Sequence, residues 1–247
     1  RALNEEISFN EYLERVYKNP KIIKSAYQRL YDAIISKGTK QKKVFRRTIT
    51  EYNFFNDPEI PVFGLEEPLD RFVKLIRGAA GWYGTEKRIF LLHGPVGSSK
   101  STICRLLKKG LERYTRTPEG ALYTYKWVNL DKDIYLKSED LSAMRQDPLV
   151  LIPINLRKKV LEDLNQIHQS MTPEKEQEKL YKLRVDEELN PRCKTFMKEL
   201  MDRYNGDLKK VLSEHIRVVR LVFSEADRVG IATFQPKDEK NQDATEL

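Results

Sequence analysis

The chain has 247 residues, with 45 Lys and Arg against 37 Asp and Glu, a formal net charge of +8. An apolar fraction of 40 % in a chain of this length supplies one large α/β domain or two small ones, and it excludes an intrinsically disordered protein. The two cysteines, Cys104 and Cys193, exclude a disulfide framework and a Cys-rich zinc module, so we expect a reducing, cytoplasmic setting. No apolar run approaches the roughly 18–20 residues of a membrane-spanning helix, so no such helix is expected.

Two helical stretches are predicted over residues 8–37. Ser8 and Glu11 form an S-x-x-E capping box, Pro20 separates the two stretches, and Gly38 is a plausible helix stop. A basic run with one aromatic residue follows over residues 40–47. We favour a solvated connector here, with a nucleic-acid surface as the less favoured alternative.

The middle of the chain has the pattern of a βαβ unit. An amphipathic helix is predicted around residues 69–76, and the short apolar run 88–93 is typical of a buried parallel strand. A helix is predicted over about 100–113 and a second strand over 121–128. The order strand, turn, helix, strand favours a parallel sheet.

The C-terminal part is charged and mostly helical. The helical pattern of residues 156–203 is interrupted at Pro173 and Pro191, and a further short helix is predicted over 208–216. Residues 218–223 form another strand candidate.

The most informative segment lies between the first predicted strand and the helix after it, which is the context of a phosphate-binding P-loop. Glycines at positions 94 and 97 let the backbone N–H groups approach phosphate oxygens, and the helix N-terminus favours an anion. Lys100 reaches the β- and γ-phosphates of ATP, and Ser101 supplies a hydroxyl ligand to Mg²⁺. The candidate cofactor-binding residues of this segment are Gly94, Pro95, Val96, Gly97, Ser98, Ser99, Lys100, Ser101 and Thr102.

The segment departs from the usual P-loop pattern at one position. Ser99 stands where the glycine before the lysine is usual, and a non-glycine residue there is strained if its φ is positive. The alternative interpretation is a Gly/Ser turn without a ligand, which we favour less. A hydrolytic acid at a strand end is not visible: the nearest candidate, residues 221–227, fits a strand that ends in a solvated acidic turn.

Several strings resemble the AAA+ module of PrkA-type serine protein kinases. They are Phe63-Gly64 with Glu66-Glu67-Pro68-Leu69, the segment Gly94–Thr102, the segment Arg116–Tyr123, and the long run Leu221–Asp243. The last run is the most specific, because a P-loop alone fits very many proteins. The resemblance covers nearly the whole chain.

This resemblance implies an α/β P-loop NTPase of AAA+ type, with a parallel sheet flanked by helices. Residues 1–50 would be an N-terminal helical region, and 51–247 the nucleotide-binding domain with a helical insertion at about 156–216. By the same resemblance, Phe63 and Gly64 belong to the element that contacts the adenine base. The magnesium-associated acid and the sensor residues would lie beyond Leu247, so the core would be truncated.

The function implied by the resemblance is binding of Mg-ATP in support of phosphoryl transfer to a protein serine. Standard kinase signatures are absent from the sequence, so the kinase activity is implied by the family alone. The alternative is an AAA+ ATPase that remodels or delivers client proteins, possibly for a protease, and this alternative predicts ATP-dependent oligomers. We expect a protein substrate as partner, allow for a homo-oligomer, and expect neither a membrane nor a nucleic acid. His93, His168 and His215 are scattered and are expected to be structural or surface residues.

Overall fold

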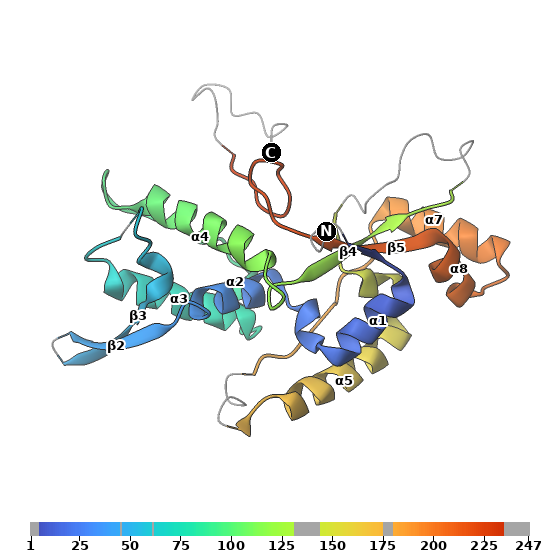
Figure 1. Ribbon diagram of the computed structural model, residues 1–247, viewed down its shortest axis with the longest axis horizontal. Coiled ribbons are helices and arrows are strands. Elements are labelled where there is room, and N and C mark those ends of the chain that lie inside the picture. Colours follow the sequence, from blue (N-terminus) through green and yellow to red (C-terminus); the bar gives the residue numbers. More distant parts are fainter. Residues whose placement is uncertain (1–4, 45, 61, 131–143, 175–179, 235–247) are drawn as a thin grey trace.

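The structure is a computed structural model that describes residues 5–44, 46–60, 62–130, 144–174 and 180–234. The described helices are α1 (Phe9–Lys18), α2 (Ala26–Ile35), α3 (Glu66–Ala80), α4 (Lys100–Thr115), α5 (Ile154–Met171), α7 (Pro191–Arg203) and α8 (Leu208–His215). The described strands are β1 (Glu6–Ile7), β2 (Thr39–Val44), β3 (Arg47–Tyr52), β4 (Leu122–Trp127) and β5 (Ile216–Leu221). Figure 1 shows two groups of elements. We call β1, β4 and β5 with α1, α5, α7 and α8 the sheet lobe, and α2, α3, α4 with β2 and β3 the loop lobe.

The sheet of the sheet lobe has the order β1-β5-β4, and its described strand pairs are antiparallel. Leu122 lies opposite Leu221, and Trp127 lies opposite Ile216. The predicted strands 121–128 and 218–223 are therefore confirmed with small shifts. They pair antiparallel with each other, so the expected parallel sheet is unconfirmed in the described residues. The reason is the connection: α8 leads directly into β5 beside the end of β4, so β5 has to run back along β4.

The core of the sheet lobe is built around aromatic residues of β4. Tyr125 and Trp127 are fully buried. The Trp127 indole packs edge-on against the Phe196 ring at 5.7 Å between centroids, and its Nε1 donates to Cys193 Sγ at 3.2 Å. These contacts attach α7 to the sheet, and they place the Cys193 thiol in the core.

Within the described residues, the predicted helical stretch 156–203 contains the helices α5 and α7. α5 ends at Met171, two residues before Pro173, and Pro191 is the first residue of α7, where a missing N–H costs nothing. In the part of the chain that the structure describes, no helix combines the length and apolar character needed to cross a membrane.

The loop lobe has a second, separate core, in which residues of α2, α3 and α4 meet. Ile34, Val73, Ile76 and Leu106 are buried in it. The capping box at Ser8, the break at Pro20 and the helices predicted around 22–34, 69–76 and 100–113 are all confirmed.

The prediction of a buried strand over residues 88–93 is wrong for this structure. Ile89 and Leu91 are 97 % and 86 % exposed, and no described strand pairs with the segment. Phe90 instead packs inward, edge-on against Tyr27 and Phe72 at 6.0 and 5.9 Å. The segment thus has one packed side and one exposed side, because no neighbouring strand covers its outer residues.

The basic run forms an antiparallel hairpin that the sequence analysis did not predict. Strand β2 pairs with β3 from Thr39 opposite Tyr52 to Val44 opposite Arg47. Residues 39–43 are exposed, which agrees with the expected solvation of the run but not with an irregular connector. The hairpin spans residue 50, and the domain boundary placed there stays a prediction.

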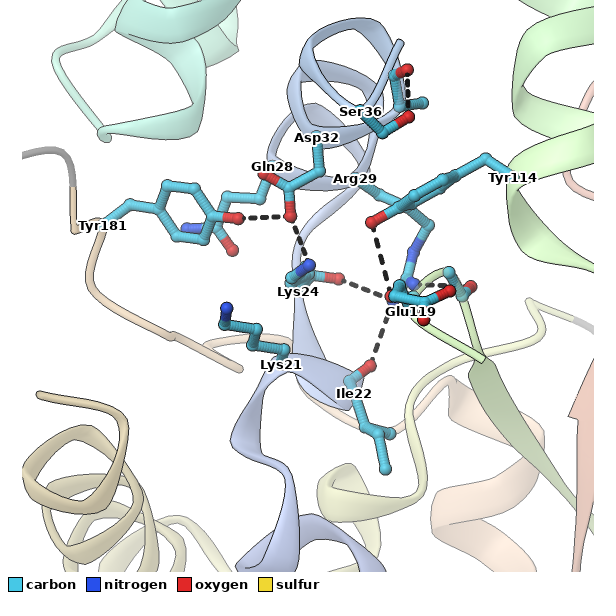
Figure 2. Close-up of polar contacts among 12 residues, drawn as sticks. Lys21, Ile22, Lys24, Gln28, Arg29, Asp32, Ser36, Tyr114, Glu119 and Tyr181 are labelled. Atoms are coloured by element: carbon cyan, nitrogen blue, oxygen red, sulfur yellow. Dashed lines mark hydrogen bonds and ion pairs between the residues drawn. The ribbon is translucent and has the colours of Figure 1, made fainter. Parts of the chain in front are cut away.

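Helix α2 connects the two lobes through buried hydrogen bonds (Figure 2). Arg29 is 2 % exposed, and its guanidinium donates to four backbone carbonyls. Two of them, Gly120 and Ala121, precede β4 and lie at 2.9 and 3.0 Å. The other two, Ile22 and Lys24, precede α2 and lie at 3.0 and 3.3 Å. Arg29 therefore fastens the start of the sheet to the start of α2.

Candidate nucleotide-binding site

The predicted P-loop lies between the exposed segment 88–93 and the first turn of α4. Gly97 has φ of 84° and Ser99 has φ of 57°, so both are left-handed. Serine at the second position is tolerable because its side chain is small, at a cost of roughly 1–2 kcal/mol for a left-handed non-glycine residue. The φ of Ser99 is thus positive, and the backbone there has the conformation that glycine adopts most readily.

Lys100 bends back over the loop that precedes it. Its Nζ donates to the carbonyl oxygens of Gly94 and Pro95, at 2.8 and 2.6 Å, and to Ser98 Oγ at 3.0 Å. All three acceptors are neutral. An ammonium forms stronger hydrogen bonds with an anion than with neutral oxygens, so this lysine is positioned to exchange them for phosphate oxygens.

The N-terminus of α4 adds a second attraction for an anion. The helix has 16 residues, its Ser99 side chain makes no capping hydrogen bond, and its first turn holds no acidic residue. The first N–H groups of a helix have no intrahelical acceptor, and they carry the positive end of the helix dipole. Ser101 is exposed in this turn, with Thr102 half-buried beside it. The segment Gly94–Thr102 thus holds three kinds of group that can bind an anion or its metal ion: backbone N–H donors, the Lys100 ammonium and the Ser101 hydroxyl.

The residues expected near an adenine base lie on another segment. Val62 and Leu65 pack into the core of the loop lobe, whereas the Phe63 ring between them is 82 % exposed. Gly64 has φ of 71° and leads into α3. Among the described residues, no hydrogen bond joins Phe63 or Gly64 to the loop 94–102.

The acidic turn after β5 is held by α4. The Glu225 carboxylate forms an ion pair with Lys108 and accepts a 2.5 Å hydrogen bond from Thr233 Oγ1. Its backbone N–H donates to Glu112 Oε1 at 2.5 Å. The hydrogen bond from Lys108 lowers the pKa of Glu225. This geometry agrees with the interpretation of the turn as solvated and acidic, but the pairing with Lys108, 117 residues earlier, has no counterpart in the sequence pattern.

No cluster of three His, Cys, Asp or Glu residues that could hold a metal ion occurs within the described ranges. His215 has a structural role: its Nδ1 lies 3.1 Å from the Val128 carbonyl oxygen, and its Nε2 lies 3.0 Å from the Tyr204 hydroxyl. His93 is exposed. His168 is buried, and its Nδ1 has no hydrogen-bond partner. The magnesium ligand predicted at Ser101 therefore stays a prediction.

Comparison with known proteins gives one match along the whole of this chain and one match along part of it. The chain is 35 % identical over 248 residues to a Bacillus subtilis (strain 168) protein named ATP-dependent protease PrkA, covering 100 % of this chain and 32 % of that protein. It is 38 % identical over 69 residues to a Geobacillus stearothermophilus protein named "Uncharacterized protein in gldA 5'region", covering 28 % of this chain and 64 % of that protein. No solved structure matches the chain.

The chain spans about a third of the length of the Bacillus protein it matches. The profile of the family described as "PrkA AAA domain" matches residues 7–247, which include the loop, the helix α4 that follows it and the acidic turn. The chain therefore belongs to the PrkA AAA domain family.

Proposed function

We propose that the segment Gly94–Thr102 binds Mg-ATP. The observation that carries the proposal is the position of the Lys100 ammonium. It donates hydrogen bonds to three neutral oxygens and lies beside the uncapped N-terminus of α4. Membership of a AAA domain family supports nucleotide binding independently. In this proposal Lys100 binds the β- and γ-phosphates, and the N–H groups from Gly97 to Thr102 bind phosphate oxygens.

The remaining residues have supporting roles. Ser101 is the proposed Mg²⁺ ligand, and the ion when bound neutralises phosphate charge. The exposed Phe63 ring and the left-handed Gly64 are proposed to contact the adenine base, by the resemblance described above. Left-handed Gly97 and Ser99 hold the loop backbone in the curve that points its N–H groups at an anion.

For the whole protein, we propose that ATP turnover is coupled to work on a protein client. The name of the Bacillus relative favours proteolysis as that work. The second candidate is transfer of the γ-phosphoryl group to a protein serine, which the resemblance of Leu221–Asp243 to PrkA-type kinases favours. Both candidates take a protein substrate, and the ATPase candidate also predicts a homo-oligomer that forms with ATP.

ATP binding is tested by titrating a fluorescent ATP analogue into the full-length protein. Lys100→Ala is expected to weaken binding by about a hundredfold, since two or more charge-assisted hydrogen bonds are lost. Lys109→Ala is the matched control and should bind like the parent. Lys109 lies on the same helix and forms an exposed ion pair, with its Nζ 3.7 Å from Glu59 Oε2. Equal affinity of the Lys100 variant and the parent would overturn the proposed site.

The two whole-protein candidates are separated by following the label from γ-labelled ATP with casein as the protein substrate. Shortened casein with label only in free phosphate supports the protease candidate. Label on casein serine that disappears in Lys100→Ala supports the kinase candidate and overturns the protease candidate. ATP binding without either outcome would overturn coupling to casein while leaving the nucleotide site in place.

A further inference from the structure

A cavity of about 540 Å³ lies between the two lobes, away from the proposed nucleotide site. Its lining includes Lys21, Tyr31, Asp32, Arg77, His168 and Tyr181. One side is formed by α2, the β2–β3 hairpin and the end of α3, and the other by the turn before α2, the end of α5 and residues 180–181. The volume is within the usual range of small-molecule sites, about 300–1,000 Å³.

The cavity is at the opposite end of α3 from the segment proposed to contact adenine. Phe63 and Gly64 precede the first turn of α3, whereas Arg77 lies in its last turn. The 11 residue steps from Glu66 to Arg77 span about 16 Å at about 1.5 Å per step. A ligand in this cavity would therefore be a second ligand and not the adenine of the nucleotide.

One wall of the cavity is held in place by a buried ion pair (Figure 2). The Asp32 carboxylate pairs with Lys24 and accepts a hydrogen bond from the Tyr181 hydroxyl at 2.7 Å. Because Lys24 compensates the charge of Asp32, this wall does not repel an anion. The Tyr181 hydrogen bond also joins residue 181 of one side to α2 of the other.

Three nitrogen groups around the cavity have no partner among the described residues. Lys21 and Arg77 are exposed side chains in its lining, and among the described residues neither forms an ion pair. His168 is 3 % exposed, and its buried Nδ1 has no hydrogen-bond partner. A buried polar atom without a partner is destabilising unless a ligand or water supplies one. These groups come from three different elements and line one cavity.

We propose that this cavity binds a small organic phosphate. Two unpaired cations, Lys21 and Arg77, match the charge of a phosphate dianion, and Arg77 offers the planar fork that binds two phosphate oxygens. The His168 side chain belongs to the same lining and adds a polar ring to it. The hydroxyl and amide groups of Thr39, Gln41 and Thr50 line the hairpin side and suit the hydroxyl groups of a sugar.

The test is calorimetric titration of the full-length protein with glucose 6-phosphate, inorganic phosphate and citrate. Glucose 6-phosphate is expected to bind saturably and equally well to the parent and to Lys100→Ala. Arg77→Gln and Lys21→Gln should each weaken it by about tenfold or more, the loss of a charge-assisted hydrogen bond. Arg71→Gln, on the exposed face of α3 beside Glu67, is the matched control and should change nothing.

A second readout places the ligand. The chain of 247 residues has three histidines, and His168→Asn assigns the ring resonance of the buried one. Addition of glucose 6-phosphate should shift the His168 resonance and leave His93 unchanged. Unfolding curves of the Arg77 and Lys21 variants should match the parent, which shows that any loss of binding is local.

Several results would overturn the proposal. These are no saturable binding of glucose 6-phosphate, loss of binding in Lys100→Ala, or binding that is unchanged in both Arg77→Gln and Lys21→Gln. Tighter binding of citrate than of glucose 6-phosphate would overturn the assignment to phosphate. Equal affinity for inorganic phosphate and glucose 6-phosphate would overturn the role of the hairpin side.

Discussion

In the sheet lobe, the aromatic residues of β4 lie in a closed core, and Trp127 is 1 % exposed. In the loop lobe, the segment that leads into the phosphate-binding loop exposes Ile89, Leu91 and Val96 almost completely. The backbone of β4 is paired with β5 along its length, whereas residues 88–93 have no described strand partner. Within the described residues, the two lobes thus differ in two ways. The sheet lobe buries the apolar side chains of β4 and pairs its backbone, whereas the segment 88–93 leaves apolar side chains exposed and its backbone without a strand partner.

The difference shows which part of the molecule provides stability and which part offers contacts to ligands. Burial of large apolar side chains is the main stabilising contribution to folding, so the sheet lobe should dominate the free energy of unfolding. In the loop lobe, the segment 88–97 leaves apolar side chains exposed. The uncapped N-terminus of α4, which follows it, keeps its N–H donors available for an anion.

The largest expected effect on stability is in the sheet core. Trp127→Ala should lower the free energy of unfolding by about 3–5 kcal/mol, because it removes a buried ring and leaves a cavity beside Phe196. Phe63→Ala, which truncates an exposed ring, should change it by less than about 0.5 kcal/mol. Urea unfolding of both variants measures the two values. Similar losses in the two variants would contradict the assignment of stability to the sheet lobe.

The next largest effect is expected where the lobes join. Arg29→Ala should cost about 3 kcal/mol, because four buried carbonyl oxygens lose their donor. It should also separate the unfolding of the lobes. Trp127 reports the sheet lobe, whereas Trp82 follows α3, donates to the Lys182 carbonyl at 2.9 Å and so reports the contact between the lobes. Arg71→Ala, at an exposed i,i+4 pair, is the control.

Unfolding is followed through each tryptophan in turn, with the other replaced by phenylalanine. In the parent background the two curves should coincide, as they do for one cooperative unit. In the Arg29→Ala background the Trp82 curve should have the lower midpoint. Coincident curves at the parent's stability would show that the Arg29 hydrogen bonds do not hold the lobes together.

A smaller effect is expected from the pH dependence of His168. Burial, with added repulsion from Lys21 and Lys24 and a partial offset from Asp32, lowers the pKa of His168 from 6.5 to about 4. Between pH 6.5 and pH 4 the unfolded chain binds a proton that the folded chain does not. Stability is therefore lost as pH falls through this window, by about 2–3 kcal/mol in total. In His168→Asn this loss should be absent, which unfolding at pH 7 and pH 4.5 measures.

Asp147 provides an opposing control. Burial raises the pKa of Asp147 to about 6, although hydrogen bonds from the Leu149 N–H and the Tyr12 hydroxyl partly offset the effect. The folded chain therefore holds a proton on Asp147 between pH 6 and pH 4 that the unfolded chain does not, so this residue adds stability as pH falls. Asp147→Asn should make the acid loss steeper than in the parent, and the opposite change would contradict the burial of this carboxyl group.

The sequence predicted features that depend on residues close together in the chain. The Ser8–Glu11 capping box and the helical spacing that ends near Ile34 predicted α1 and α2, and the spacing around Gly97 and Lys100 predicted the loop before α4. Each involves residues within about two helical turns of one another, so the backbone conformation follows from local hydrogen bonds and side-chain patterns.

Features that depend on distant residues could not be predicted. The Arg29 hydrogen bond to Gly120 joins residues 91 positions apart, and the pair of Lys108 with Glu225 joins residues 117 positions apart. Antiparallel pairing of β4 with β5 depends on the position of the end of α8 beside the end of β4, which no local sequence pattern encodes. The β2–β3 hairpin was not predicted, because its lysine-rich first strand lacks alternating apolar residues.

The smallest expected effect separates the two descriptions of residues 88–93. In the structure Ile89 points to solvent and Phe90 packs on Tyr27 and Phe72, so Ile89→Ser should cost less than about 0.5 kcal/mol and Phe90→Ser about 1–3 kcal/mol. Amide hydrogens of this segment should also exchange faster than those of β4, because they have no strand partner. A strand buried on both faces, as the apolar run predicted, would make both substitutions costly and all of these amides slow. Equal losses of unfolding free energy in the two variants would therefore mean that another part of the full-length protein covers Ile89. The contrast between the lobes would then hold only for the 247 residues taken by themselves.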